Sequence, residues 1–228
     1  MSDLLCRATG VGIAFVGDEA VLVGSGPGDV PTVWSSTDGL RWVDHGQAFA
    51  GLLPRAVVSD GKTAMLFATG ATATWSSTTT DGSTWTTPAA IPGLPGTLVI
   101  SGGFRIDGQS TIIASVGGVL GKIRADDSGG WVTTPASGLT ADDLGMVSQF
   151  AGGLLAVGGN GPGARAWVSR DGPSWRVLAL PAALSVDGAS VNSVAIRGGR
   201  ALLIGTVPAG IDAPASSIWT GSAELLAP

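Results

Sequence analysis

The chain has 228 residues, of which 44% are hydrophobic, so it is long enough to bury a substantial core. Its 37 glycines far exceed ordinary usage and only 13% of its residues are charged, which indicates many turns and argues against long helices. The net charge of −5 and the scattered basic residues argue against nucleic acid or an anionic membrane as a partner, because phosphate binding relies on clustered Lys and Arg.

Two rare residue types restrict the chemistry further. The single cysteine, Cys6, excludes an internal disulfide, and the single histidine, His45, excludes a histidine-cluster metal site, so we expect neither a metal nor a cofactor. Asp3 and Arg7 interrupt the apolar residues of the first segment, which is not typical of a secretory signal. No apolar run approaches the ~20 residues that span a bilayer. We therefore expect cytoplasmic synthesis and no membrane insertion.

A tryptophan-flanked turn recurs along the chain. Its copies are Trp34–Trp42 (WSSTDGLRW), Trp75–Trp85 (WSSTTTDGSTW), Ile123–Trp131 (IRADDSGGW), Trp167–Trp175 (WVSRDGPSW) and a truncated copy that starts at Trp219. The first and fourth copies begin 133 residues apart, which predicts a repeat of about 44 residues.

Upstream of each copy, two apolar runs are joined by a turn dipeptide. The dipeptides are Gly17-Asp18, Asp60-Gly61, Asp107-Gly108, Gly152-Gly153 and Gly198-Gly199. Such pairs tolerate the positive φ angles that a two-residue hairpin needs. Each repeat therefore predicts four antiparallel strands joined by a hairpin, a Gly/Pro-rich loop and an Asp-Gly turn.

A single sheet of this size cannot bury both of its faces, so neighbouring copies must stack. Radial stacking predicts an all-β, five-bladed β-propeller of four-stranded antiparallel blades. The expected blades are approximately 1–44, 45–88, 89–134, 135–178 and 179–228, within one domain of residues 1–228. A linear stack is the alternative, but it would expose two large apolar end faces. Residues 4–8 are a candidate outer strand beside the truncated last repeat.

The frame Ser/Thr-x-Asp-Gly-x-x-Trp resembles the Asp-box, or BNR, repeat of sialidase-like β-propellers, without the usual residue between Asp and Gly. The resemblance covers essentially the whole chain and implies that the boxes lie at the blade periphery, away from any active site. The residues expected in this structural role are Ser36, Asp38, Gly39, Trp42, Asp81, Gly82, Trp85, Asp127, Trp131, Ser169, Asp171, Gly172 and Trp175.

The physical role of the boxes follows from their residues. Each aspartate is expected to accept hydrogen bonds from N–H groups of its turn, each glycine to take a left-handed conformation, and each tryptophan to pack between blades. On this basis, Trp42→Ala is expected to cost about 3–5 kcal/mol of stability.

The opposite ends of the blades are the expected ligand site. The loops there are 24–31, 158–165 and 205–217 within repeats, and 44–56, 133–145 and 178–190 between repeats. The candidate ligand-binding residues are His45, Arg55, Asp142, Asp143, Asn160 and Arg165. An arginine can bind a carboxylate or a glycan bidentately. The alternatives are a solvated loop histidine at His45, a turn or an acidic rim at Asp142-Asp143, and surface arginines at Arg55 and Arg165.

The resemblance also bears on function. Sialidases of this fold use a tyrosine nucleophile, and this sequence contains no tyrosine, so we expect no catalytic residue of that kind. We expect a non-catalytic binding or structural module for protein–protein assembly or surface recognition. The chain is similar to small propeller proteins of bacteriophage tails and decorations, which implies a virion component. The alternatives are a glycan-binding lectin and a sialidase-fold glycoside hydrolase or lyase, which would need two carboxylates about 5–10 Å apart.

Overall fold

The computed structural model describes residues 9–46, 49–126, 130–150, 153–159, 163–180, 182–197, 200–208 and 214–222. These residues form strands and loops, together with one 3-10 turn at Ala182–Leu184 (η2). Within these ranges there is no helix of the length and apolarity needed to cross a bilayer. By its contacts the chain forms two compact units, residues 1–117 with 123–133, and residues 118–122 with 134–228.

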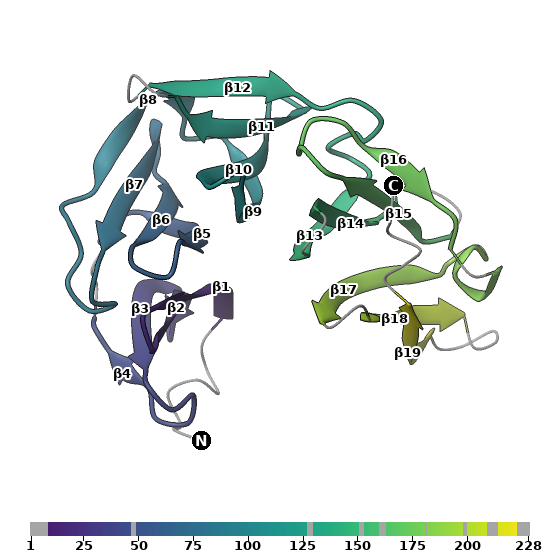
Figure 1. Ribbon diagram of the computed structural model, residues 1–228, viewed down its shortest axis with the longest axis horizontal. Helices are drawn as coiled ribbons and strands as arrows, with labels where there is room; N and C mark the ends of the chain where they lie inside the picture. Colours follow the sequence, from purple (N-terminus) through teal and green to yellow (C-terminus); the bar gives the residue numbers. More distant parts are fainter. Residues whose placement is uncertain are drawn as a thin grey trace. The chain divides into compact units, whose positions relative to one another are not determined.

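Three antiparallel sheets begin in the first unit, and the strands of each follow one another in chain order (Figure 1). The first sheet holds β1 (Thr9–Val16), β2 (Glu19–Gly26), β3 (Val30–Ser36) and β4 (Val43–Asp44). The second holds β5 (Leu53–Ser59), β6 (Ala64–Thr69), β7 (Ala73–Thr79) and β8 (Ala89–Pro95). The third holds β9 (Val99–Ile106), β10 (Gln109–Val116), β11 (Val119–Ala125) and β12 (Trp131–Pro135).

Two further sheets belong to the second unit. The fourth sheet holds β13 (Leu144–Phe150), β14 (Gly153–Gly158), β15 (Arg165–Ser169) and β16 (Arg176–Leu178). The fifth holds β17 (Ser190–Arg197), β18 (Arg200–Pro208) and β19 (Pro214–Ser222), which are its three strands within the described ranges. The prediction of an all-β fold with five antiparallel propeller blades is confirmed.

The second sheet extends beyond the range expected for its blade. The second sheet continues to Pro95, because Ala89–Pro95 pairs with β7 as its outer strand. This segment lies within the range expected for the third blade. Residues 4–8, the candidate outer strand, lie outside the described residues.

Two of the predicted hairpin dipeptides form two-residue turns. Val16 pairs with Glu19 across Gly17-Asp18, and Ile106 pairs with Gln109 across Asp107-Gly108. Asp107 and Gly108 have φ angles of 52° and 74°, the two positive values that a type I′ turn requires.

The other predicted hairpins differ from expectation or lie outside the described residues. At Asp60-Gly61 the prediction of a two-residue turn was wrong, because Ser59 pairs with Ala64 and leaves four residues in the loop. The Asp60 carboxylate stabilises this longer loop by accepting hydrogen bonds from the N–H groups of Lys62 and Thr63. In the fourth sheet Gly153, which was predicted to lie in the turn, pairs with Phe150 and is the first residue of β14. The two residues between them, 151–152, and the predicted turn 198–199 are not described.

Each sheet has two distinct ends. We call the end where the second and third strands are joined the loop end; in the first sheet the join is the three-residue loop 27–29. The opposite turn end carries the hairpin between the first two strands and the Asp-Gly turn before the fourth. The loops at the loop end are shorter than expected, because residues 24–26 and 30–31 of the first expected loop belong to strands.

A β-bulge recurs near the loop end in the first strand of every sheet. In the first sheet Gly10 pairs with Gly24 and Gly12 with Val23, which leaves one extra residue between them. The extra residues of the five sheets are Val11, Arg55, Ser101, Gly145 and Asn192. A bulge bends its strand and changes the direction of the side chain it carries. In the second sheet that side chain is an arginine.

The cores lie between successive sheets of each unit. The first strands of neighbouring sheets run side by side, β1 with β5, β5 with β9, and β13 with β17. Val23 of β2 and Leu66 of β6 belong to one buried cluster, and Leu155 of β14 and Val194 of β17 to another. Successive side chains of a strand point to opposite faces of its sheet. Stacking one sheet on the next therefore buries apolar residues that a single sheet would expose.

The tryptophans occupy unequal environments. Trp34 and Trp167 are only 1% and 2% exposed. Trp85 packs edge-on against Phe49, with ring centroids 5.6 Å apart and planes at 78°. Trp42 is only partly buried, and its Nε1 donates a hydrogen bond to the carbonyl of Gly39 at 3.2 Å. Trp42 is thus less buried than Trp34 and Trp167, and its N–H bonds to its own hairpin.

Candidate functional site

The Asp-Gly turns at the turn end form a repeated hydrogen-bonded unit. We call Ser36–Trp42, Thr79–Trp85 and Ser169–Trp175 the aspartate turns. In the second of them, the Thr79 hydroxyl accepts a hydrogen bond from the Gly82 N–H at 3.0 Å, and the Asp81 carboxylate accepts from the Ser83 and Thr84 N–H groups at 2.9 and 2.7 Å. The other two turns repeat the first contact, with Gly39 donating to Ser36 and Gly172 to Ser169. The carboxylates of Asp38, Asp81 and Asp171 each accept hydrogen bonds from N–H groups of their own turn.

The third repeat departs from this pattern. Asp127 lies outside the described residues, and its neighbour Asp126 accepts a hydrogen bond from the Gly130 N–H at 2.7 Å. Trp131 packs edge-on against Phe67, with ring centroids 5.5 Å apart. Its ring therefore contacts the core between the second and third sheets.

The hydrogen bonds of the turns keep their carboxylates ionised. Donation from the backbone N–H of Thr84, then of Ser83, lowers the pKa of Asp81 far below its usual 3.8. The corresponding backbone donors Arg41 and Leu40 lower the pKa of Asp38. For Asp171, burial acts to raise the pKa, but the donors of Ser174 and Ser169 outweigh it and the net shift is downward. These groups are suited to accept hydrogen bonds and unsuited to donate a proton near neutral pH.

Asp81→Asn is expected to lower stability at neutral pH, with a loss that shrinks in acid. Because the folded pKa is depressed, the contribution of the carboxylate is fully present above its unfolded pKa of 3.8 and is lost as the pH falls through the lower folded pKa. Urea unfolding of wild type and variant at about pH 7 and pH 3 measures this difference. Asp18→Asn, in an ordinary hairpin, controls for the loss of one charge. An equal difference between wild type and Asp81→Asn at both pH values would contradict the expectation.

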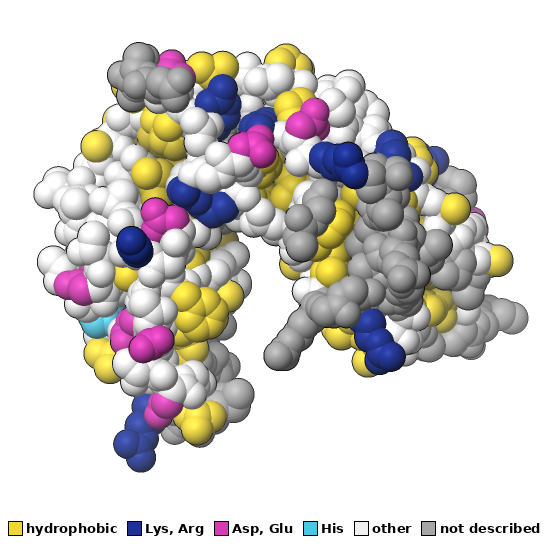
Figure 2. Space-filling model, in the orientation of Figure 1, with side chains coloured by type: hydrophobic (Ala, Val, Ile, Leu, Met, Phe, Trp, Pro, Cys, Tyr) yellow, Lys and Arg dark blue, Asp and Glu magenta, His cyan; other side chains and the backbone are white. Residues whose placement is uncertain are grey.

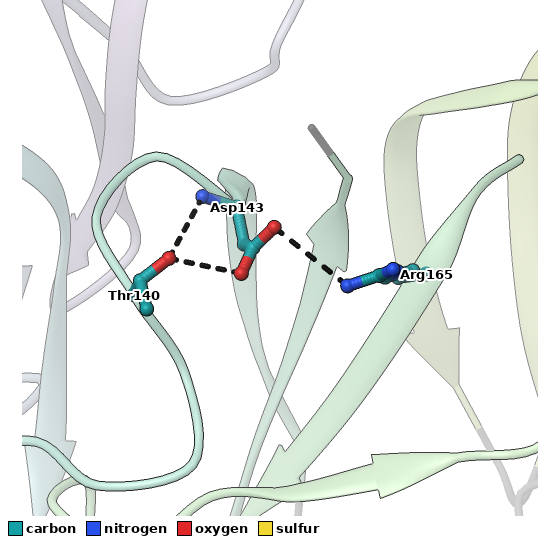
Figure 3. Close-up of polar contacts among 3 residues, drawn as sticks. All are labelled: Thr140, Asp143 and Arg165. Carbon is teal, nitrogen blue, oxygen red and sulfur yellow. Dashed lines mark hydrogen bonds and ion pairs between the residues drawn. The ribbon is translucent and has the colours of Figure 1, made fainter. Parts of the chain in front are cut away.

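At the loop end of the fourth sheet, Thr140, Asp143 and Arg165 form a polar cluster (Figure 3). Leu144 and Arg165 both pair with Gly158, so Asp143 and Arg165 lie at the same end of two strands that flank β14. The Thr140 hydroxyl donates to Asp143 Oδ2 at 2.9 Å, and Arg165 Nη1 lies 3.9 Å from Asp143 Oδ1. The arginine side chain is 48% exposed and the aspartate 22%. A carboxylate fixed by a hydroxyl thus stands beside an accessible guanidinium.

Glycine at position 158 is required for this arrangement. A Cβ there would lie 2.2 Å from the Asp143 carbonyl oxygen and 2.5 Å from the Gly145 nitrogen. The bulge therefore brings the backbone of residues 143–145 against β14 at Gly158, which has no side chain. The sequence showed Gly158 only as one of several glycines in a turn-rich stretch.

The other predicted ligand-binding residues are distributed over the two units. Arg55 occupies the bulge of β5, is exposed, and its Nε donates to the Thr69 hydroxyl at 3.0 Å. His45 continues the outer edge of the first sheet, where its N–H donates to Val33 and its Nε2 lies 2.8 Å from the Ser35 hydroxyl. Asp142 is exposed beside Asp143. Asn160 lies outside the described residues.

Charged groups do not gather into one surface patch in the view of Figure 2, where basic and acidic side chains are interspersed. Among the residues with described positions, no three His, Cys, Asp or Glu side chains group closely enough to hold a metal ion. The structure thus brings together Asp143 and Arg165 from the predicted set and holds Arg55 at the loop end of a different sheet.

The fold resembles that of known propellers, although no family model and no curated protein matches the sequence. The chain is similar to the exo-β-1,3-galactanase of Phanerochaete chrysosporium, with a TM-score of 0.56 and 15% identity over 88% of this chain and 56% of that one. It is similar to Trypanosoma rangeli sialidase, with a TM-score of 0.58 and 12% identity over 94% and 47%. A chain of the nidogen/laminin complex gives a TM-score of 0.57 at 13% identity over 88% and 76%.

These similarities support a sialidase-like β-propeller fold and, at such identities, the fold alone. The chain spans about half the length of the galactanase and sialidase chains that it matches.

Proposed function

We propose that the protein is a non-catalytic propeller that binds a protein partner within a larger assembly through the loop ends of its blades. The observation that carries this proposal is the bulge repeated in the first strand of each sheet, which in the second sheet directs Arg55 to the loop end. Bulges recur at the rims of sheets where a side chain is aimed at a ligand.

Two arginines supply the recognition chemistry. Arg55 is held through Nε by Thr69, and Arg165 lies beside Asp143, so each guanidinium is oriented by one neighbour and remains accessible. A guanidinium positioned in this way can bind a carboxylate through two parallel N–H groups. Acidic side chains of a protein partner fit these donors, and the exposed Asp142 can pair with a basic side chain of the same partner.

The non-catalytic part of the proposal is supported by the state of the turn carboxylates. Glycoside hydrolysis requires a carboxylic acid whose pKa is raised so that it can donate a proton. The pKa values of Asp38, Asp81 and Asp171 are lowered, and each is occupied by donors of its own turn. These turns have the contacts expected of Asp-box hairpins. The further hypothesis of a bacteriophage virion component rests on the sequence resemblance alone.

Removing either loop-end arginine is expected to weaken partner binding. The partner is first captured from the native source on the immobilised protein and identified, and its affinity is then measured with both proteins purified. Arg55→Ala and Arg165→Ala should each cost about 2 kcal/mol, or roughly thirtyfold in affinity, because a paired charge loses its partner.

Arg41→Ala is the matched control, since it removes one exposed positive charge at the turn end of the first sheet. It should leave the affinity unchanged. Wild-type affinity of both loop-end variants would refute the proposal.

A glycan is the second candidate for the loop end. It is favoured by the neighbouring structures, which include an arabinofuranosidase and a family 117 glycoside hydrolase in addition to the galactanase. A glycan array read with wild type and with Arg165→Ala distinguishes the two ligands. If the wild type binds a glycan and Arg165→Ala does not, the ligand of the loop end is a saccharide and not a protein.

A further inference from the structure

The fifth sheet differs from the other four at its outer edge. Its last strand, β19, pairs with β18 over nine residues, from Pro214 to Ser222, without a bulge. No other described strand pairs with the far side of β19. The backbone N–H and C=O groups on that side therefore form a row with which another extended chain can pair.

The outer strands of the other sheets are protected against such pairing. β4 has two residues and β16 has three, while β8 contains two prolines and β12 ends in a proline. Short strands and prolines are common means of preventing a sheet edge from adding a further strand. In β19 the one proline, Pro214, is the first residue, and none of the nine residues is charged. The edge of β19 thus has the features of a strand that accepts a partner strand.

The exposed side chains of β19 are uncharged and include a large apolar residue. Trp219 packs on the cluster shared with the fourth sheet, so its neighbour Ile218 points to the opposite face. Ile218 is 68% exposed, and Ile204, which pairs with it on β18, is 41% exposed. Ser216 and Thr220 lie two residues on either side of Ile218 and are also exposed. A strand added beside β19 would place its own side chains next to these residues.

The sequence of β19 fits a second copy of itself. When two identical strands pair antiparallel about a two-fold axis, an axis through the middle residue gives every residue a partner. The middle residue of β19 is Ile218, so it would lie opposite Ile218 of the second copy, and Ser216 opposite Thr220. Apolar pairs and Ser–Thr pairs are favourable across strands. The uncharged edge also places no like charges opposite each other, although each chain has a net charge of −5.

We propose that two copies of the protein form a two-fold symmetric dimer in which their β19 strands pair antiparallel, centred on Ile218. The fifth sheets of the two copies then become one continuous sheet, with Ile204 and Ile218 of both copies in one row across it. The pairing satisfies the outward backbone groups of both strands at once. It lies on the outer strand of the fifth sheet and goes beyond the loop-end function proposed above.

Cysteine cross-linking tests the pairing and its register. In a Cys6→Ser background, Ile218→Cys places two thiols opposite each other, at the Cα separation of about 4.5–5.5 Å that a disulfide can bridge. Mild oxidation of the full chain should convert most of it to a covalent dimer on a non-reducing gel. Ser216→Cys is the matched control, since its two copies would be at least about 13 Å apart along the strands. It should stay monomeric on the gel alone and cross-link when mixed with Thr220→Cys.

Sedimentation equilibrium measures the association itself. The wild type should approach twice the mass of one chain as its concentration rises. Ile218→Lys places like charges opposite each other at the axis and should raise the dissociation constant at least about tenfold. Val177→Lys is the matched control, because Val177 is 65% exposed on the outer strand of the fourth sheet, and it should associate as the wild type does. Urea unfolding verifies that both variants are folded.

A wild type that stays monomeric at every concentration, or Ser216→Cys that cross-links by itself as readily as Ile218→Cys, would overturn the proposal. Hydrogen exchange of the β19 amides identifies the other occupant of the edge, because slow exchange in a monomer would mean that a segment of the same chain covers it. Arg55→Ala and Arg165→Ala should dimerise as the wild type does, so failure of the loop-end function and failure of the dimer are distinguishable.

Discussion

Trp34→Ala is expected to lower the free energy of unfolding by about 3–5 kcal/mol, as large-to-small changes in a packed core do. Trp34 lies on β3, the third strand of the first sheet, where it is paired with Leu22 on one side and Asp44 on the other. Its side chain is 1% exposed. A strand held on both sides cannot collapse into the space that the indole leaves, so the cavity persists and its cost adds to the lost transfer free energy.

Trp42→Ala provides the matched control at the other end of the same nine-residue segment. Its ring is only partly buried and contacts its own turn, so the loss should be less than half that of Trp34→Ala. Urea unfolding followed by far-ultraviolet circular dichroism measures both changes. Equal losses for the two variants would show that the environments of the two rings are not those described above.

Gly158→Ala is expected to destabilise the protein by about 2–4 kcal/mol, although the change adds only one methyl group. The atoms that a Cβ would meet belong to the backbone of Asp143 and Gly145, 2.2 and 2.5 Å away. Backbone held in a bulge cannot move aside as a flexible side chain can. The variant should therefore also displace Asp143 from Arg165, and partner binding at the loop end should weaken with stability.

Gly10→Ala is the control for this prediction, since Gly10 also adjoins the bulge of its sheet. A Cβ there would meet only the tip of the Leu22 side chain, at 3.2 Å, so the loss should be well below that of Gly158→Ala. Urea unfolding gives the stability of both variants, and ¹⁵N–¹H spectra report whether the resonance of the Asp143 amide moves. Wild-type stability of Gly158→Ala would mean that β13 and β14 are not in the register described.

The repeated turns were predictable from sequence because their residues are dictated by local chemistry. Asp81 accepts from N–H groups two and three residues onward, and Gly82 has a φ angle of 78°, so both contacts can be read from spacing alone. The positive φ angles of Asp107 and Gly108 can likewise be predicted from the dipeptide itself. The order of the strands in each sheet was also predictable, because strands joined by short turns usually pair with their neighbours in the chain.

The bulges could not be predicted, because an extra residue leaves no mark in a pattern of alternating apolar residues. Arg55 therefore appeared as a loop residue, whereas it stands on the first strand of a sheet. The strand Ala89–Pro95 was also missed, since its two prolines and a glycine are typical of a linker. Prolines are tolerated there because β8 is the outermost strand of its sheet.

The pairing of Asp143 with Arg165 needed the register of three strands, which no local spacing provides. Both residues were candidates, but nothing in the sequence placed them next to each other. His45 was a candidate for the opposite reason, as the only histidine, and the structure holds it at a sheet edge with Ser35.

The contacts of the aspartate turns have a fixed direction along the chain. Gly82 of the second sheet lies against Glu19 and Val21 of the first, and Trp175 of the fourth donates its backbone N–H to the carbonyl of Ser137, which precedes that sheet. These two turns thus contact residues that come before their own sheets in the chain. Duplication or loss of one entire repeat would preserve contacts of this kind. Evolution could therefore change the number of repeats without altering the junctions between them.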